Sequence, residues 1–390
     1  MQNFEFYNRT RIVFGRETQN NVGALTKKHA KKVLLHYGGG HIKKSGLYQQ
    51  VTDSLEKENV AFIELPGVMP NPRLSLVREG IALCRENGVD FILAVGGGSV
   101  IDSAKAIAAG VPYDGDIWDM YVSGVPPTEA LGVGVVLTIP AAGSEASVGS
   151  VISDDSDNNN KRAFNHEMLQ PQFAILNPEL TFSLPPYQTA CGASDIIAHI
   201  AERYFTRVKN VELTDRLCEA ALKTVIRNTQ KVLQDPNDYD ARAEIMWAGT
   251  VAHNNLLNTG RIGDWASHMI EHELSSINDV AHGAGLAILM PAWMHYVCKQ
   301  DPALFAQYAV RVWNVEADFG DLELTALEGI RRQKDFFRSI GLPVTLGEIG
   351  ITPAHYERIA QNTRRSDKDT VGNFVRLRSE DIMQILKLAE

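Results

Sequence analysis

The chain has 390 residues, 44% of them hydrophobic and 22% charged, which is ordinary for a globular protein but long for a single core. The formal net charge of −9 argues against nucleic acid as the main partner, and no uncharged apolar stretch is long enough to span a membrane. The four cysteines form no CxxC pair and no basic, apolar leader is visible, so we expect a cytoplasmic protein without disulfides or a thiolate metal site.

The first half of the chain alternates short β-branched runs with amphipathic helical stretches. The expected strands are 11–14, 32–37, 60–65, 90–95, 134–139 and 172–176, and the expected helices lie near 45–58, 72–87 and 99–109. Strands that alternate with helices predict a mostly parallel sheet with helices on both faces. The polar, turn-rich stretch 153–160 is expected to join two strands of a hairpin.

Tandem prolines, Pro185 and Pro186, mark a change in pattern. After them come long segments with helical period and few strand signals, including a helix start at Thr352-Pro353. The sequence therefore predicts an α/β domain over residues 1–185 and an all-helical domain over residues 186–390.

Three turns rich in glycine or hydroxyl groups each follow a predicted strand. In the 97–99 turn, backbone N–H groups and the start of a helix favour a pyrophosphate, and Ser99 is placed to cap that helix or to bind phosphate. The GxGxxG fingerprint is absent, because Ile101 stands at its third glycine. The 38–40 turn and the 138–147 segment are the other two. Together they favour a dinucleotide cofactor over three unliganded βα turns.

Four residues with ligand chemistry have paired spacing in the second half. Asp195 and His199 are four residues apart in a predicted helix and so share one face, and His268 and His282 follow within a His-rich stretch. One carboxylate and three imidazoles suit iron(II) or zinc, and the residues leave both open. A structural role for the pairs also stays open at this point.

A competing motif overlaps the same stretch. His268, Glu271 and His272 match the HxxEH signature of a zinc peptidase, with Glu271 as general base. That interpretation gives no use to the glycine turns, so it is the weaker one.

Several longer motifs occur in one order along nearly the whole chain: GGGSVIDSAKAIA, TIPAAGSEAS, DIIAHIAE and WASHMIEHELS…VAHGAGLAILMPAW. In these motifs and their order, the chain resembles the iron-containing, or group III, alcohol dehydrogenase family. The resemblance is strongest to the branch of NADPH-dependent butanol dehydrogenases and aldehyde reductases. The resemblance implies a dehydroquinate-synthase-like architecture: a dinucleotide-binding α/β domain, a helical metal-binding domain, and an active site in the cleft between them. The chain departs from the pattern at 140–145, where many members read TAGTGSE, and at 272–274, where many read HPL.

The resemblance also implies roles for single residues. It makes His272 a catalytic residue near the nicotinamide, and the metal ligands would be Asp195, His199, His268 and His282. The cofactor positions that it implies are Gly38, Gly39, Asn71, Gly97, Gly98, Ser99, Thr138, Ser147 and Lys161, and Asp102 and Ser144 in the same segments are added as candidates.

The expected function is a metal-dependent oxidoreductase, acting as a homodimer, that transfers hydride between NAD(P)H and aldehydes or primary alcohols. NADP(H) is expected over NAD(H), because residues 38–41 contain no acid and Lys43 and Lys44 follow them. The alternative from another class is a dehydroquinate-synthase-like lyase. It is less favoured because such an enzyme needs cationic groups for an anionic substrate, and residues 263–295 contain no Lys or Arg.

Overall fold

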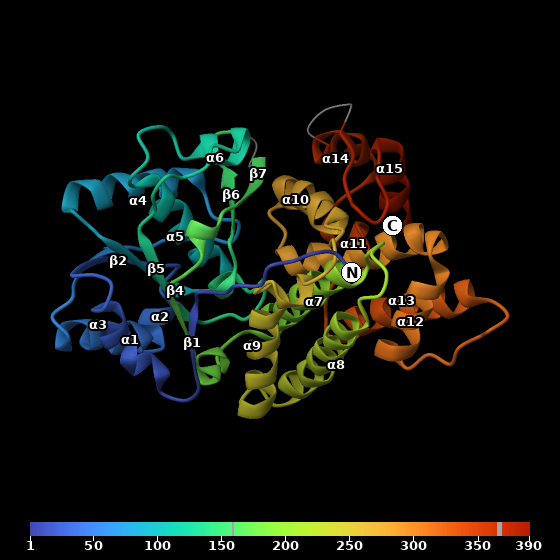
Figure 1. Cartoon of the computed structure of the whole chain (residues 1–390), viewed down its shortest axis with the longest axis horizontal. Helices are drawn as coiled ribbons and strands as arrows, with labels where there is room; N and C mark the ends of the chain where they lie inside the picture. Colours follow the sequence, from blue (N-terminus) through green and yellow to red (C-terminus); the bar gives the residue numbers. More distant parts are fainter. Residues whose placement is uncertain (158–159, 365–368) are drawn as a thin grey trace. The chain divides into compact units, whose positions relative to one another are not determined.

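The computed structural model describes residues 1–157, 160–364 and 369–390. The chain divides into two compact units, one formed by Tyr7–Ser183 and the other by Met1–Phe6 together with Leu184–Glu390. The strands belong to the first unit, whereas the second is built from helices (Figure 1). In the part of the chain that the structure describes, no helix is both long and apolar enough to cross a membrane.

The first unit is built on a six-stranded sheet in which every pair of neighbouring strands is parallel. In spatial order its strands are β1 (Arg11–Phe14), β8 (Phe173–Leu176), β5 (Gly132–Leu137), β4 (Phe91–Gly96), β2 (Lys32–Tyr37) and β3 (Ala61–Leu65). Each strand lies within two residues of its predicted position. The β-branched runs located them correctly because a strand buried on both faces is apolar along its whole length, as β4 is.

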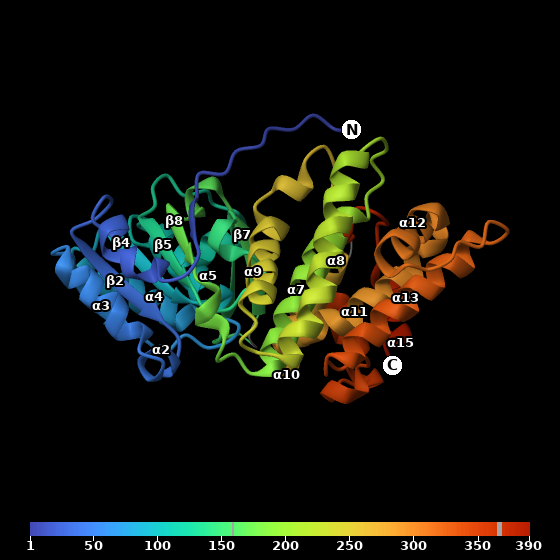
Figure 2. The ribbon, with the colours of Figure 1, turned by 90° about the horizontal axis from the view of Figure 1, so that it is seen from below.

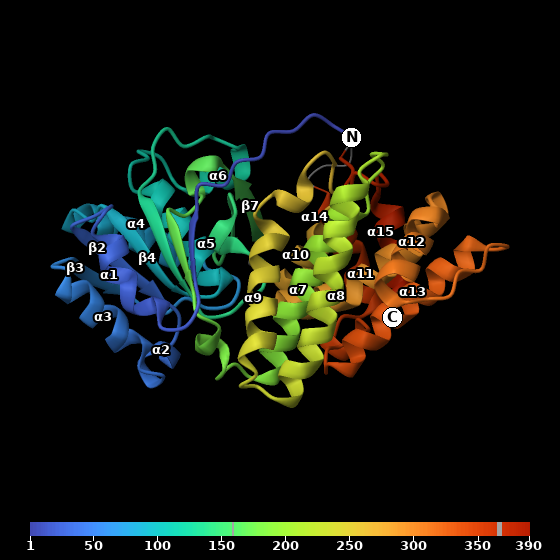
Figure 3. The same ribbon diagram turned by 60° about the horizontal axis from the view of Figure 1, so that its bottom comes forward.

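Helices cover both faces of this sheet (Figure 3). On one face, α1 (Val22–Thr26) and α3 (Leu47–Lys57) share a buried apolar cluster with side chains of β2, β4 and β8. On the other face, α4 (Leu74–Asn87) packs on α5 (Gly98–Gly110), which in turn packs on β4. The sheet thereby becomes a rigid frame whose strand ends carry the turns.

Two short helices and a hairpin of two strands also belong to the first unit. The helices α2 (His41–Lys44) and α6 (Trp118–Ser123) follow β2 and α5, and β6 (Gly149–Asp154) pairs antiparallel with β7 (Asn160–Asn165). This hairpin confirms the turn predicted over 153–160, of which residues 158 and 159 lie outside the described residues.

The second unit is helical, as the change of pattern after Pro185 predicts. Its α-helices are α7 (Pro186–Tyr204), α8 (Glu212–Gln234), α9 (Tyr239–His253), α10 (Ala266–Asn278), α11 (His282–Val297), α12 (Pro302–Trp313), α13 (Leu322–Ser339), α14 (Tyr356–Thr363) and α15 (Ser379–Leu388). The helices α7, α8 and α9 pack side by side (Figure 2). At the centre of this unit, α11 packs on α7, α10, α13 and α15, which explains why most of its residues are apolar and buried.

Candidate functional site

The three predicted turns lie at the same end of the sheet, where its parallel strands have their carboxyl ends. The strands β2, β4 and β5 are parallel neighbours, and their register sets Tyr37 beside Val95 and Gly96 beside Leu137. From β2 the chain continues outward to β3 and then returns to β4 on the opposite side of β2. The carboxyl ends of β2 and β4 therefore flank the topological switch point, where open α/β sheets bind their ligands.

The glycine turn after β4 leads straight into α5. Gly97 is the residue before the helix and Gly98 is its first residue, so Ser99 is a helical residue and does not cap α5. The capping role that the sequence left open for Ser99 is therefore wrong. A Cβ atom on Gly97 would lie 3.0 Å from the Ile139 side chain, so a bare backbone suits this approach.

A buried lysine holds the loop that follows β5. Lys105 Nζ donates to the Ser144 carbonyl at 2.7 Å, to the Ser147 carbonyl at 2.9 Å and to the Gly149 carbonyl at 2.8 Å. Ser144 Oγ in turn donates to Asp102 at 2.5 Å. Burial raises the pKa of Asp102 and lowers the pKa of Lys105 to about 8, and the opposite charge of each partner counteracts both shifts. Asp102, Ser144 and Ser147 thus belong to one buried hydrogen-bond network that holds the loop after β5 against α5.

A cavity of about 210 Å³ lies at the same end of the sheet. Its wall includes His41 and Ile42 of α2, Thr138 at the end of β5, and Asn177 and Leu180 after β8. Thr138, a predicted cofactor-binding residue, therefore lines a cavity together with residues of α2.

The remaining cofactor candidates come from neighbouring segments. The 38–39 turn follows β2, and the Gly38 carbonyl accepts a hydrogen bond from Gly67 N at 3.0 Å. Asn71 adopts a left-handed backbone conformation, with φ of 54°, between β3 and α4, and Lys161 lies on β7. Both side chains are buried.

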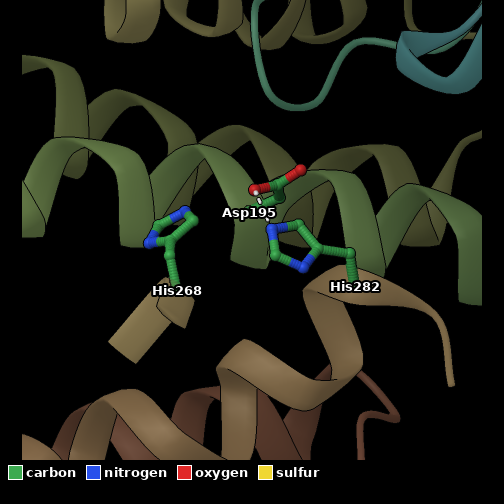
Figure 4. A group of neighbouring side chains, drawn as sticks. All are labelled: Asp195, His268 and His282. Carbon is green, nitrogen blue, oxygen red and sulfur yellow. Dashed lines mark ion pairs between the residues drawn. The ribbon is translucent and has the colours of Figure 1, made fainter. Parts of the chain in front are cut away.

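Four residues predicted as ligands meet in the helical unit. Asp195 and His199 lie on α7, His268 on α10, and His282 is the first residue of α11. Asp195, His268 and His282 each offer a ligand atom within 4.8 Å of the other two (Figure 4). His199 Nε2 lies 3.3 Å from Asp195 Oδ1, and His282 Nε2 lies 3.9 Å from the same oxygen. Two atoms that bind one ion at about 2.0–2.2 Å are separated by roughly 3–4 Å, so these distances suit a single ion.

Glycine allows the close helix packing that builds this cluster. A Cβ atom on Gly283 would lie 2.0 Å from the Cys191 carbonyl oxygen, so only glycine lets α11 begin against α7 at this point. Cys191 precedes Asp195 by one helical turn, and His282 precedes Gly283. The contact therefore places the His282 imidazole beside the Asp195 carboxylate.

Glu202, which the sequence analysis did not single out, orients His268. Its buried carboxylate accepts from His268 Nδ1 at 3.1 Å and from the backbone N–H groups of Trp265, at 2.6 Å, and His268, at 3.3 Å. It thus anchors the start of α10, where Trp265 has a positive φ of 72°. With Nδ1 used in this way, His268 presents Nε2 to the cluster, as expected for a metal-binding histidine held by a carboxylate.

Glu271 plays the same part for His282. It is buried, and it accepts hydrogen bonds from His282 Nδ1 and from Ser275 Oγ. Glu271, His272 and His282 also form a second group of ligand-type residues, but both oxygens of Glu271 are engaged. This favours Asp195, His199, His268 and His282 as the ligand set. It also removes the general base that the HxxEH interpretation requires.

Unused buried atoms show that the cluster fits a cation. Asp195 Oδ1, His199 Nδ1 and His268 Nε2 are buried and make no hydrogen bond among the described residues, and His199 Nε2 is the ring nitrogen that faces Asp195. Leaving such polar atoms buried is costly unless a ligand satisfies them. Burial and the neighbouring His268 imidazole hold the pKa of His199 well below its usual value, which keeps the ring neutral, the form that binds metal.

The carboxylate partners lead to a first prediction. We expect Glu202→Gln to lower the affinity for the divalent metal roughly 10- to 100-fold, because the charge that fixes the His268 ring is lost. Competition with a chelator measures this affinity, and Glu212→Gln, at an exposed position of α8, is the charge-matched control. Equal metal affinity in both variants would contradict the orienting role.

A parallel sheet with glycine turns at its switch point and a helical unit with one carboxylate and three imidazoles are typical of enzymes that combine a nucleotide with a divalent metal. Two family models match the chain: "Iron-containing alcohol dehydrogenase" over residues 9–178 and "Fe-containing alcohol dehydrogenase family, C-terminal" over residues 189–389. The chain belongs to the iron-containing alcohol dehydrogenase family.

Two relatives and one solved structure match this chain over 90% or more of its length. It is 41% identical over 389 residues to NADH-dependent butanol dehydrogenase B of Clostridium acetobutylicum, with 99% of each chain covered. It is 39% identical over 356 residues to the NADPH-dependent aldehyde reductase YqhD of Escherichia coli, with 90% of each covered. The crystal structure of NADH-dependent butanol dehydrogenase A from Thermotoga maritima matches it with a TM-score of 0.96 and 40% identity, covering 100% of this chain and 99% of that one.

Proposed function

We propose that the protein is a metal-dependent oxidoreductase that transfers hydride between NAD(P)H and aldehydes or primary alcohols. The observation that carries the proposal is the cluster of Asp195, His268 and His282, with His199 beside Asp195, in which three buried polar atoms make no hydrogen bond among the described residues. Membership of the iron-containing alcohol dehydrogenase family supports the same activity.

Asp195, His199, His268 and His282 would hold the metal, iron(II) or zinc, which when bound supplies Lewis-acid polarisation of the carbonyl or alcohol oxygen. Glu202 and Glu271 fix two of the imidazoles, so the cluster is formed before a substrate arrives. His272 is half-buried next to the cluster, with its ring centroid 5.8 Å from that of His282. We assign to its imidazole the transfer of the proton that accompanies hydride transfer.

The nicotinamide cofactor would bind at the carboxyl end of the sheet. Backbone N–H groups at Gly97 and Gly98 and the start of α5 suit its pyrophosphate, and the cavity beside α2 suits its adenosine. The turn 38–40 contains no acid that would repel a 2′-phosphate, which favours NADPH, and the preference for NADPH over NADH stays a prediction.

The substrate should be neutral. Arg203 and Arg261 lie near the metal cluster, but both are buried. Arg203 stacks on Trp265 and donates to the His199 carbonyl, and Arg261 donates to the Arg203 carbonyl and to Asp215. Residues 263–295 add no Lys or Arg. This environment suits an uncharged aldehyde better than the anionic substrate of a dehydroquinate-synthase-like lyase.

The test is an NAD(P)H oxidation assay with metal-loaded protein and a panel of aldehydes. The sharpest pair is butanal and 4-oxobutanoate, which have equal carbon chains but differ by one carboxylate. We expect kcat/KM for butanal to be higher by roughly 10- to 100-fold, since residues 263–295 contribute no Lys or Arg to pair with a desolvated carboxylate. Failure to oxidise NADH or NADPH with any aldehyde would refute the oxidoreductase. That the protein forms a homodimer also stays a prediction, which a light-scattering measurement of its mass in solution would test.

A substitution in the 38–40 turn tests the cofactor site. A Cβ atom on Gly39 would meet no atom within 4 Å, so Gly39→Asp adds a carboxylate without a clash. We expect it to shift the NADPH:NADH ratio of kcat/KM toward NADH by tenfold to a hundredfold, about 1–3 kcal/mol of repulsion against the 2′-phosphate. Gly39→Ala is the matched control. An equal shift in both variants would refute a 2′-phosphate position at this turn.

A further inference from the structure

Glu64, on the edge strand β3, collects three donors that are distant in sequence. Its carboxylate accepts from Tyr37 Oη at 2.5 Å and from Tyr48 Oη at 2.5 Å, and Lys43 Nζ donates to it at 3.3 Å. These residues come from the end of β2, from α3 and from α2. Lys43, one of the two lysines expected to favour a 2′-phosphate, is thus paired with Glu64 in this structure.

The ion pair of Lys43 and Glu64 lies beside the carboxyl end of the sheet, where the nucleotide is proposed to bind. Tyr37 is the last residue of β2 and is followed by the glycine turn 38–40, after which α2 carries both Lys43 and the cavity-lining residues His41 and Ile42. Lys43 therefore directly follows Ile42, a residue that lines the cavity. A released lysine could reach toward that side, because its four-carbon stem is flexible and half of its side chain is exposed.

Both members of the pair are charged at neutral pH. Hydrogen bonds with Tyr37 and Glu64 raise the pKa of Lys43 to about 12. Burial acts to raise the pKa of Glu64, but the hydrogen bonds from Tyr37, Tyr48 and Lys43 outweigh it, and its pKa falls below the usual value. The Lys43 ammonium also lies 4.5 Å from the centre of the Tyr48 ring, so that a carboxylate and an aromatic face hold it together.

We infer that Glu64 is a specificity-determining residue for the choice between NADPH and NADH, an inference that rests on the proposed nucleotide function. By holding Lys43, its carboxylate withholds an ammonium from the 2′-phosphate and lets NADH compete. The glycine turn admits either cofactor, and Glu64 limits how strongly the phosphate is preferred.

Glu64→Gln separates the charge from the shape. The amide oxygen still accepts from one tyrosine hydroxyl and the amide N–H group can donate to the other, whereas the ion pair with Lys43 is lost. Both consequences favour a 2′-phosphate, because an ammonium is released and a negative charge is removed. Glu56→Gln is the matched control: Glu56 is exposed on α3, eight residues and thus about 12 Å along the helix from Tyr48, and its change in net charge is identical.

The experiment is a calorimetric titration of the full chain with adenosine 2′,5′-bisphosphate and with 5′-AMP. We expect Glu64→Gln to tighten binding of the bisphosphate about 5- to 10-fold and to change AMP binding by less than about twofold, as for one added charge-assisted contact. Lys43→Met should have little effect in the unmodified chain but should cancel the gain in the Glu64→Gln background, which makes a double-mutant cycle.

Each result has a separate meaning. An equal gain in Glu64→Gln and Glu56→Gln would show a general charge effect and overturn the inference, as would a gain that survives Lys43→Met. If neither nucleotide bound the unmodified chain, the nucleotide function itself would fall, and the inference with it. A bisphosphate gain that depends on Lys43 and is absent with AMP would establish it.

Discussion

His268→Ala should abolish most of the bound metal and most of the turnover. His268 is buried on α10, its Nδ1 is held by Glu202, and its Nε2 makes no hydrogen bond among the described residues. Removing it leaves Asp195, His199 and His282. We expect metal affinity to fall more than roughly 100-fold, since losing a ligand exceeds the loss of the group that orients it. Turnover should fall roughly 10²- to 10⁴-fold, or about 3–5 kcal/mol of lost Lewis-acid stabilisation.

Elemental analysis after dialysis measures the metal, and NAD(P)H oxidation measures the turnover. His295→Ala is the matched control, because His295 is an exposed histidine on α11, the helix that begins with His282. In His268→Ala the buried Glu202 carboxylate loses one hydrogen-bond partner, which could destabilise the fold. Circular dichroism therefore checks that the variant is folded before its metal loss is interpreted. Full turnover by a folded, metal-free protein would refute the metal-dependent mechanism altogether.

The sheet could be predicted from the sequence because its signals are local. A strand such as β4 lies between two layers of helices, so its residues are uniformly apolar and glycine follows directly. The proximity of Asp195 and His199 could be predicted for a similar reason, because residues four apart in a helix share one face. Short elements such as α2 and α6 were missed, because four to six residues leave little periodicity to detect.

The groups that position these residues were harder to predict because they act across long sequence separations. Glu202 holds His268 from 66 positions away, and Glu64 holds Lys43 from 21 positions away. One signal was available for Glu202: it follows Asp195 by seven residues, two helical turns, and so lies on the same face. For Glu271 the signal was present but pointed elsewhere, because HxxEH suggests a general base.

Burial also changed what single residues can do. Lys105 reads as an ordinary helix lysine, yet it is fully buried and ties the 144–149 loop to α5. His253, which looks like a solvated histidine at the end of α9, has its ring centroid only 4.4 Å from that of His199. Neither placement follows from local pattern, since both depend on which loop or helix end packs against them. Sequence spacing thus predicted which ligand-type residues lie close together better than it predicted their surroundings.

His272→Ala should keep the metal and lose turnover. His272 lies one helical turn after His268 on α10 and belongs with Glu271 and His282 to the second group of ligand-type residues. Because both Glu271 oxygens are engaged by His282 and Ser275, we assign His272 to proton transfer and not to the metal. Removing a positioned acid or base lowers kcat/KM roughly 10²- to 10⁴-fold.

The variant is measured beside His268→Ala, for metal content and for the pH dependence of kcat/KM with butanal. The proton-transfer role predicts full metal content and a pH profile that loses one of its ionisations, because the imidazole no longer exchanges a proton with the substrate. A purely structural role would lower turnover equally at every pH. If instead His272→Ala lost as much metal as His268→Ala, the group of Glu271, His272 and His282 would hold the ion, and the assignment of Asp195 and His199 as ligands would have to be abandoned.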